Sequence, residues 1–98
     1  MGEGPQRLDK WLWFARLVRT RGLAQELIEA GRVRVNRERA LASSRLVRSG
    51  DVLTVALAGG VRVIRVTGFA ERRGPPTSVA DLYEDLAPRA RPGAGGEP

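Results

Sequence analysis

The chain has 98 residues, enough for one domain with a small hydrophobic core. Seventeen Lys and Arg against eleven Asp and Glu give a net charge of +6 and an isoelectric point near 11.4, which favours a polyanionic partner such as nucleic acid. Because the sequence has no Cys and no His, it excludes thiolate and imidazole metal sites, disulfides and Cys or His nucleophiles; we predict a non-enzymatic protein without catalytic residues, metal, cofactor or small-molecule substrate.

Residues 1–6 hold two glycines and a proline and are expected to form a disordered N-terminus. No apolar run precedes Arg7, so no signal peptide is visible, and no stretch approaches the roughly 18 apolar residues of a membrane span. We therefore expect a cytoplasmic protein with no membrane partner.

The first helix is predicted from apolar residues at the spacing i, i+3, i+4, i+7, namely Leu8, Trp11, Leu12 and Ala15, with Phe14 and Val18 widening the stripe. Asp9, Trp13 and Arg16 fall on a different arc of the helical wheel. We expect Asp9 to orient a neighbouring arginine such as Arg16, or simply to favour the helix N-terminus. Trp13 either stacks on a nucleobase or covers a neighbouring segment of the chain.

A second helix is predicted to run from an N-cap at Thr20 to Ala30, with Gly31 at the C′ position. Its apolar face is formed by Leu23, Ala24, Leu27 and Ile28, whereas Glu26 and Glu29 lie on a separate strip. Arg21 and Gln25 are one turn apart and project from the same side. This sorting leaves a positive helix N-terminus, where free backbone N–H groups favour phosphate.

Strands and turns follow. Residues 32–35 alternate as a half-buried strand that places Arg32 and Arg34 on one face, and Asn36 opens a turn. Residues 52–57 and 61–67 form a hairpin around Gly59 and Gly60. The predicted fold class is α+β, with two N-terminal helices packed on a small, mainly antiparallel sheet.

The C-terminal part is predicted to be an extension, residues 69–87, outside a domain that covers residues 7–68. Ser78 and Asp81 resemble a capping box for a short C-terminal helix that contains Leu82, Tyr83 and Leu86. Residues 88–98 are rich in Pro, Gly and Ala and are expected to be a disordered tail.

Basic charge is concentrated in the first half of the chain. Between Arg7 and Arg48, eleven Lys and Arg face four Asp and Glu, a local net charge of +7. Arginine could serve only as a solvated surface residue, but composition alone does not explain this segregation.

Several motifs in this region resemble the S-four RNA-binding domain, also called the alpha-L RNA-binding motif. They are Arg7-Leu-Asp-Lys10, Thr20-Arg21, Gln25, Gly31-Arg-Val-Arg-Val-Asn36 and Val47-x-x-Gly50-Asp51. Within that superfamily, residues 7–13, Glu71-Arg-Arg73 and Leu82-Tyr-Glu84 resemble the group of bacterial heat-shock protein fifteen, which extends the resemblance to about Leu86.

The resemblance implies a non-catalytic protein that binds structured RNA, in particular ribosomal RNA of large subunits that carry peptidyl-tRNA, in a heat-shock and ribosome-rescue role. Carried over by position, the RNA-binding residues are Arg7, Asp9, Lys10, Thr20, Arg21, Gln25, Arg32 and Asn36. Wheel and strand geometry add Arg16 and Arg34. We expect the protein to act as a monomer.

Two departures from the family pattern stand out. Arg37 follows Asn36 where the family often has glycine, a position where φ > 0 is costly for a side chain. Members of the heat-shock group also tend to continue with a long charged extension, and we expect contacts made by that extension to be missing from a chain that stops at Pro98.

In the expected mechanism, the basic side chains pair with phosphates while Gln25 and Asn36 add neutral hydrogen bonds, so that the protein reads RNA shape more than sequence. Three alternatives remain: a helix-turn-helix protein that binds duplex DNA, an RNA-targeting module that works with a separate RNA-modifying enzyme, and a protein-interaction module that uses Trp13 and Tyr83.

Overall fold

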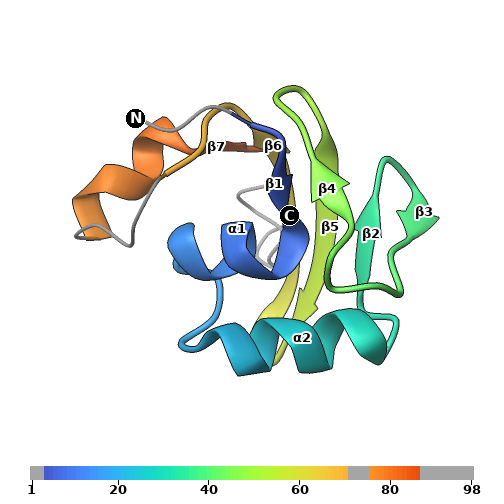
Figure 1. Cartoon of the computed structure of the whole chain (residues 1–98). Coiled ribbons are helices and arrows are strands. Elements are labelled where there is room, and N and C mark those ends of the chain that lie inside the picture. The colour runs from blue at the N-terminus through green and yellow to red at the C-terminus, as the bar shows by residue number, and fades with distance from the viewer. Residues whose placement is uncertain (1–3, 71–75, 87–98) are drawn as a thin grey trace, which may run out of the picture.

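A computed structural model of the chain describes residues 4–70 and 76–86, drawn in colour in Figure 1. Two α-helices, α1 (Leu8–Phe14) and α2 (Arg21–Glu29), pack against β-structure, and a 3-10 helix, η1 (Pro76–Asp81), lies near the C-terminal end. The strands are β1 (Gln6–Arg7), β2 (Val33–Val35), β3 (Glu38–Arg39), β4 (Leu46–Val47), β5 (Val52–Leu57), β6 (Gly60–Val66) and β7 (Tyr83–Asp85).

The strands form two sheets, and every pair in them is antiparallel. The larger sheet has the order β3-β2-β5-β6-β7, and β1 pairs with β4 in a separate two-stranded ribbon. This arrangement confirms the predicted α+β class. Gln6, which we expected in a frayed terminus, is opposite Val47 in the ribbon.

The core lies between the two helices and one face of the larger sheet. All six apolar residues predicted for the first helix are buried, and so are Val33, Val35, Leu53, Val55, Ile64 and Val66 from the sheet. Trp11 connects the layers, because its indole N–H donates to the Gly68 carbonyl at 2.9 Å and its ring meets Tyr83 edge-on at 6.2 Å. A Cβ on Gly68 would collide with the carbonyl oxygen of Asp81, so this close approach requires glycine.

Both helices end in a Schellman motif. At the end of α2, Gly31 and Arg32 donate backbone hydrogen bonds to Ile28 and Leu27, and Gly31 has φ 78°, as its C′ position predicted. Helix α1 closes in the same way, with Arg16 at the left-handed position and φ 61°. The apolar stripe had suggested a longer helix; α1 stops at Phe14 because the chain turns at Arg16.

A short C-terminal helix is present, but the prediction that it contains Leu82, Tyr83 and Leu86 is wrong. The capping pattern gives η1, and the chain then becomes strand β7 at the edge of the larger sheet. Two ion pairs hold β7 on β6, Arg65 to Glu84 at 2.8 Å and Arg62 to Asp85 at 2.9 Å. Residues 88–98, predicted to be a disordered tail, lie outside the described residues.

Candidate nucleic-acid interface

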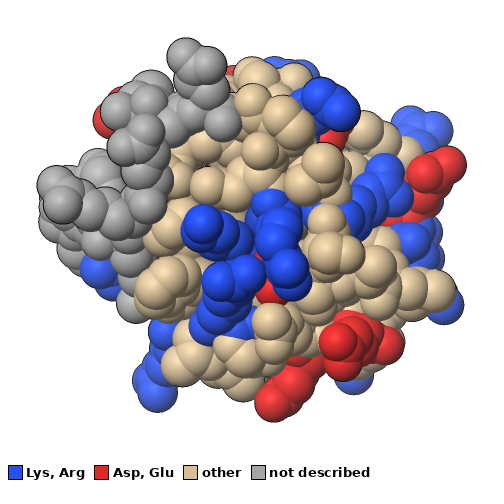
Figure 2. Space-filling view, viewed as in Figure 1, with Lys and Arg blue, Asp and Glu red and all other residues tan. Residues whose placement is uncertain are grey.

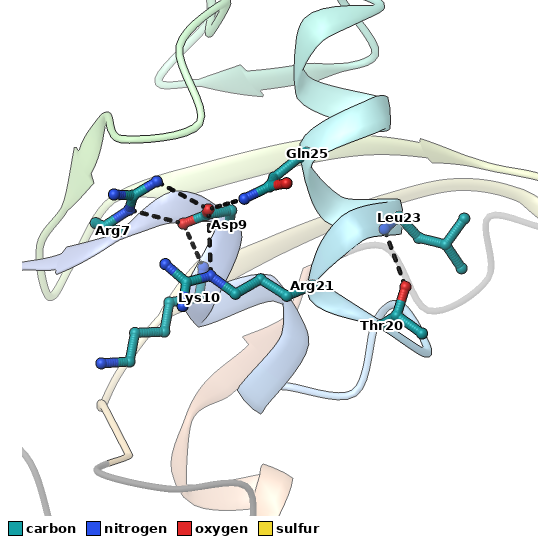
Figure 3. A network of polar contacts seen from close by, with 7 residues as sticks. All are labelled: Arg7, Asp9, Lys10, Thr20, Arg21, Leu23 and Gln25. Carbon is teal, nitrogen blue, oxygen red and sulfur yellow. Dashed lines mark hydrogen bonds and ion pairs between the residues drawn. The ribbon is translucent and has the colours of Figure 1, made fainter.

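Asp9 is the centre of the network drawn in Figure 3. Its side chain, in the first turn of α1, is 0% exposed. The Arg7 guanidinium donates two hydrogen bonds to the carboxylate, from Nε to Oδ1 at 3.1 Å and from Nη2 to Oδ2 at 3.0 Å. This bidentate arrangement is the geometry in which Arg binds a carboxylate most specifically.

Helix α2 brings two more donors to Asp9. Gln25 Nε2 donates to Oδ2 at 2.9 Å and Arg21 Nε donates to the same oxygen at 3.3 Å. The backbone N–H of Lys10 donates to Oδ1 at 2.8 Å, while the Lys10 ammonium extends away from the carboxylate (Figure 3). One carboxylate thus joins the first turn of α1, the extended residue before it and the first turns of α2.

Local sequence explains why these groups meet. Thr20 is the N-cap of α2, and its hydroxyl accepts a hydrogen bond from the Leu23 N–H at 3.0 Å, so the helix begins at Arg21. Arg21 and Gln25 are then one turn apart on the face that meets α1, as the sequence predicted. Asp9 contacts neighbouring arginines as expected, but they are Arg7 and Arg21 and not Arg16, the example that the sequence suggested, which lies beyond the end of α1.

Burial acts to raise the pKa of Asp9, because a charged group loses hydration in the protein. The hydrogen bonds from Arg7 and Gln25, together with the charge and hydrogen bond of Arg21, outweigh burial and hold the pKa below 3.8. Asp9 is therefore a carboxylate at neutral pH and keeps both guanidinium groups in place.

The two guanidinium groups remain partly open to solvent. The side chains of Arg7 and Arg21 are 44% and 40% exposed, and a single negative charge serves both of them. Lys10, whose ammonium lies 5.8 Å from the centre of the Phe14 ring, adds a further positive charge. Together these groups form a positively charged surface whose exposed N–H groups can donate to a ligand from solvent.

Figure 2 shows this face of the molecule. Lys and Arg side chains gather over β1, α1 and the start of α2 and continue toward β4, while the acidic side chains on this face cluster mainly over the later part of α2. Glu26 and Glu29 are exposed on α2, on the strip predicted from the sequence. The acidic and basic side chains of α2 are thus separated in space.

The backbone of Arg45 lies beside this surface, and the sequence did not predict Arg45 as a site residue. Its carbonyl accepts the Leu8 N–H at 2.7 Å, and the next residue, Leu46, is opposite Arg7 in the β1–β4 ribbon. The Arg45 guanidinium lies 3.7 Å from Glu38, too long for a tight ion pair. Only the pairing of two-residue strands far apart in the sequence brings the Arg45 backbone to the start of α1, and no local pattern signals that pairing.

Three predicted RNA-binding residues lie elsewhere. Arg34 is exposed on β2 between the buried Val33 and Val35, so it projects from the sheet face opposite the helices, and Arg32 continues the same alternation. Asn36 has a structural role: its amide donates to Asp51 at 3.0 Å and its carbonyl accepts the Val52 N–H at 2.9 Å. The predicted surface is therefore divided between two faces.

Tryptophan placement partly follows the sequence. Trp11 is buried, while Trp13 is half-buried and its ring stacks on Phe14 at 5.4 Å. Within residues 4–70 and 76–86, no cluster of three or more acidic side chains could hold a metal ion. The same residues include no helix long and apolar enough to cross a membrane.

Comparison with known proteins finds relatives of this chain. The S4 domain family model matches residues 6–53. Heat shock protein 15 of Escherichia coli (strain K12) is 42% identical over 81 residues, which cover 83% of this chain and 60% of that relative. The RQC P-site tRNA stabilizing factor of Halalkalibacterium halodurans is 37% identical over 65 residues, which cover 66% of this chain and 73% of that relative.

A solved structure is also similar. The trimeric structure of Vibrio cholerae heat shock protein 15 superposes with a TM-score of 0.80 and 33% sequence identity, and the match covers 87% of this chain and 85% of that one. The chain belongs to the S4 domain family of RNA-binding proteins, in the group of heat shock protein 15.

Proposed function

We propose that the chain binds structured RNA without catalysing a reaction, through the Asp9 surface, which consists of Arg7, Lys10, Arg21, Gln25 and Arg45. The observation that carries this proposal is the buried Asp9 carboxylate, which fixes two half-exposed guanidinium groups side by side before any ligand arrives. Fixed donors lose less conformational entropy when they bind phosphate than mobile ones do.

The chemistry suits the backbone of folded RNA. Guanidinium groups bind phosphate oxygens in a bidentate manner, and the ammonium of Lys10 adds a point charge beside them. Because the major groove of A-form RNA is too narrow for side chains to read its base edges, a rigid surface of this kind recognises the path of the backbone. Specificity then depends on RNA shape more than on sequence.

The finer proposal is that the RNA is ribosomal RNA of the large subunit, in particular subunits that carry peptidyl-tRNA, and that the protein acts in heat shock and ribosome rescue in the cytoplasm. It is supported by the names of similar proteins, a heat shock protein and a P-site tRNA stabilizing factor. The match spans 60% of the length of the E. coli relative, so the whole activity of that protein is part of the proposal.

A competition assay tests whether the chain binds structured RNA. Labelled structured ribosomal RNA is bound in raised salt and challenged with unlabelled RNA of the same fold or with duplex DNA. We expect RNA to displace the probe far better than DNA does; preferential retention on DNA would contradict the proposal. A helix-turn-helix mode is already disfavoured, because Glu26 and Glu29 lie on the exposed side of α2 and Arg21 and Gln25 contact α1.

Single substitutions test whether RNA binds at the Asp9 surface. Lys10→Gln removes one charge and leaves every hydrogen bond to Asp9 in place, because Lys10 contacts Asp9 only through its backbone. We expect weaker RNA binding at unchanged thermal stability. Arg65→Gln is the matched control, since Arg65 on β6 is paired with Glu84 on β7 and should not contact RNA. Equal losses in the two variants would show that only net charge matters.

Sedimentation with ribosomal particles tests whether the RNA is that of the large subunit. Sedimentation of the protein with large subunits that carry peptidyl-tRNA, with vacant large subunits and with small subunits gives three comparable measurements. The proposal predicts preferential sedimentation with the first kind. Binding to small subunits alone would overturn the ribosomal assignment while leaving RNA binding intact.

A further inference from the structure

A second group of arginines lies on the sheet face opposite the helices. Val33 and Val35 are fully buried under the helices, and Arg34 between them is exposed, so its side chain points to the other side of β2. Arg39 is directly opposite Arg34 on β3 and is also exposed. Arg32 lies two residues before Arg34 and is also exposed, so the alternation places it on the same face. Its carbonyl accepts a hydrogen bond from the Ala56 N–H at 2.9 Å.

The strand register concentrates positive charge there. Arg34 has Arg39 as its partner on one side and Thr54 on the other, so a guanidinium pair and a hydroxyl lie in one row across β3, β2 and β5. Like charges directly opposite each other on neighbouring strands destabilise a sheet. No Asp or Glu occupies a position of this face on β2, β3 or β5, so nothing there relieves the repulsion.

None of the three arginines forms an ion pair or a side-chain hydrogen bond with another residue that the structure describes. Arg39 is nevertheless held in place. A Cβ on Gly31 would lie 3.1 Å from Cδ of Arg39 and 3.4 Å from its Nε, so the stem of Arg39 rests against the glycine that ends α2. The group is positioned by the fold and its N–H donors have no acceptor among the described residues.

We propose that Arg32, Arg34 and Arg39, the sheet-side strip, bind the phosphates of an RNA segment separate from the one bound by the Asp9 surface. The inference rests on the proposed function for the class of ligand and goes beyond it in assigning a second surface. Because the sheet and its buried core lie between Arg34 and the Asp9 network, a short straight duplex bound at one of them cannot reach the other. The protein thus binds two RNA segments at once.

The test counts bound RNA. A stem-loop RNA of one helical turn is titrated into the whole chain at low salt, with stoichiometry read by calorimetry and native mass spectrometry. The unaltered chain should bind two stem-loops, and Arg34→Gln combined with Arg39→Gln should bind one. The salt slope of log K for a long structured RNA should fall by about 1.5 in that variant, since each neutralised phosphate contact contributes 0.7 to 0.9.

The matched control is Arg62→Gln combined with Arg65→Gln, which removes the same charge from β6, where acidic partners already neutralise both arginines. This control should still bind two stem-loops. Thermal unfolding confirms that each variant is folded, and Arg34→Gln alone serves as a milder second variant. The inference is overturned if the unaltered chain binds one stem-loop, or if the Arg34 and Arg39 variant binds two. Failure of the unaltered chain to bind any RNA would instead overturn the proposed function as well.

Discussion

Asp9 is both charged and fully buried, a combination that costs solvation free energy unless hydrogen-bond donors replace the lost water. Arg7, Arg21, Gln25 and the Lys10 backbone supply those donors. A residue that repels phosphate therefore stabilises the side chains that attract it. Its proposed role in RNA binding is to position them.

Replacing Asp9 with Asn should weaken RNA binding although it removes a negative charge. The amide retains one acceptor oxygen but presents an NH2 group to the guanidinium groups, which lose their fixed positions. Glu29→Gln is the control, because it removes the same charge from an exposed site on α2. RNA affinity is measured by fluorescence anisotropy. Binding by the Asp9 variant as tight as by the Glu29 variant would contradict a positioning role.

The lowered pKa of Asp9 also predicts how stability depends on pH. Since the folded-state pKa is below 3.8, the carboxylate contributes stability above that pH and loses it as pH falls through the folded-state value. Asp9→Asn should reduce the free energy of unfolding at pH 7 by about 2 kcal/mol, typical of hydrogen bonds to charged groups. Urea unfolding should show this difference shrinking in strong acid, and a constant difference would contradict it.

Arg37 has a backbone conformation that is costly for a residue with a side chain. Asn36 and Arg37 have φ 51° and 77°, so the two-residue turn between β2 and β3 has positive φ at both positions, as in a type I′ turn. Arg37→Gly should therefore raise the free energy of unfolding by about 1 kcal/mol. Arg37→Ala removes the same side chain but keeps the strain. Equal stabilisation by Ala and Gly, measured by urea unfolding, would show that charge and not backbone strain is responsible.

At the scale of elements, Trp11 is the side chain that joins α1 to the sheet and to β7. It is buried, donates to the Gly68 carbonyl and meets the Tyr83 ring. Trp11→Ala should lower the free energy of unfolding by about 3 kcal/mol or more. Leu41→Ala, at a site 62% exposed, is the control and should change little. A similar midpoint of thermal unfolding in the two variants would contradict this account of the core.

Elements with strong local signals were predicted well. The Thr20 cap and Gly31 mark both ends of α2, and the apolar spacing of the first helix identifies its buried side. The end of α1 was missed because Arg16 occupies a left-handed position that usually signals itself by glycine. The β1–β4 ribbon was missed because its pairing is non-local, and β7 because a local capping pattern competed with an open sheet edge.

The residues of the candidate site were predicted only in part from the sequence. The resemblance and the helix spacing identified Arg7, Asp9, Arg21 and Gln25, which the structure brings together. The division of the arginines between two faces depends on the register of β2 with β3 and β5, which a single strand pattern does not reveal. The prediction that these residues bind RNA stays a prediction.

Among the described residues, charge is sorted along the surface of the whole molecule. On the face drawn in Figure 2, basic side chains gather over β1, α1 and the start of α2 and continue toward β4, while the acidic side chains cluster mainly over the later part of α2. Glu26 and Glu29 are both exposed on that helix. If the four basic residues of the Asp9 surface each neutralise one phosphate, log K for RNA should fall with log salt at a slope of about −3 to −4. Anisotropy titrations across a salt series measure the slope, and a slope near zero would contradict a phosphate-binding surface.

The oligomeric state of the chain is also a property of the whole molecule. We expected a monomer, whereas the similar Vibrio cholerae protein has a trimeric structure. Light scattering coupled to size-exclusion chromatography decides between the two for this chain. Two RNA surfaces on one monomer and one surface repeated in a trimer would have different stoichiometries with a short stem-loop RNA.

The most direct test of the central claim is a nuclear magnetic resonance titration of the protein with structured ribosomal RNA, observing the arginine Nε–H signals. We expect large changes for Arg7 and Arg21, whose Nε–H groups donate to Asp9, and small ones for Arg62 and Arg65, which are paired with the acidic residues of β7. Changes at Arg62 and Arg65 with unaltered signals from Arg7 and Arg21 would contradict it.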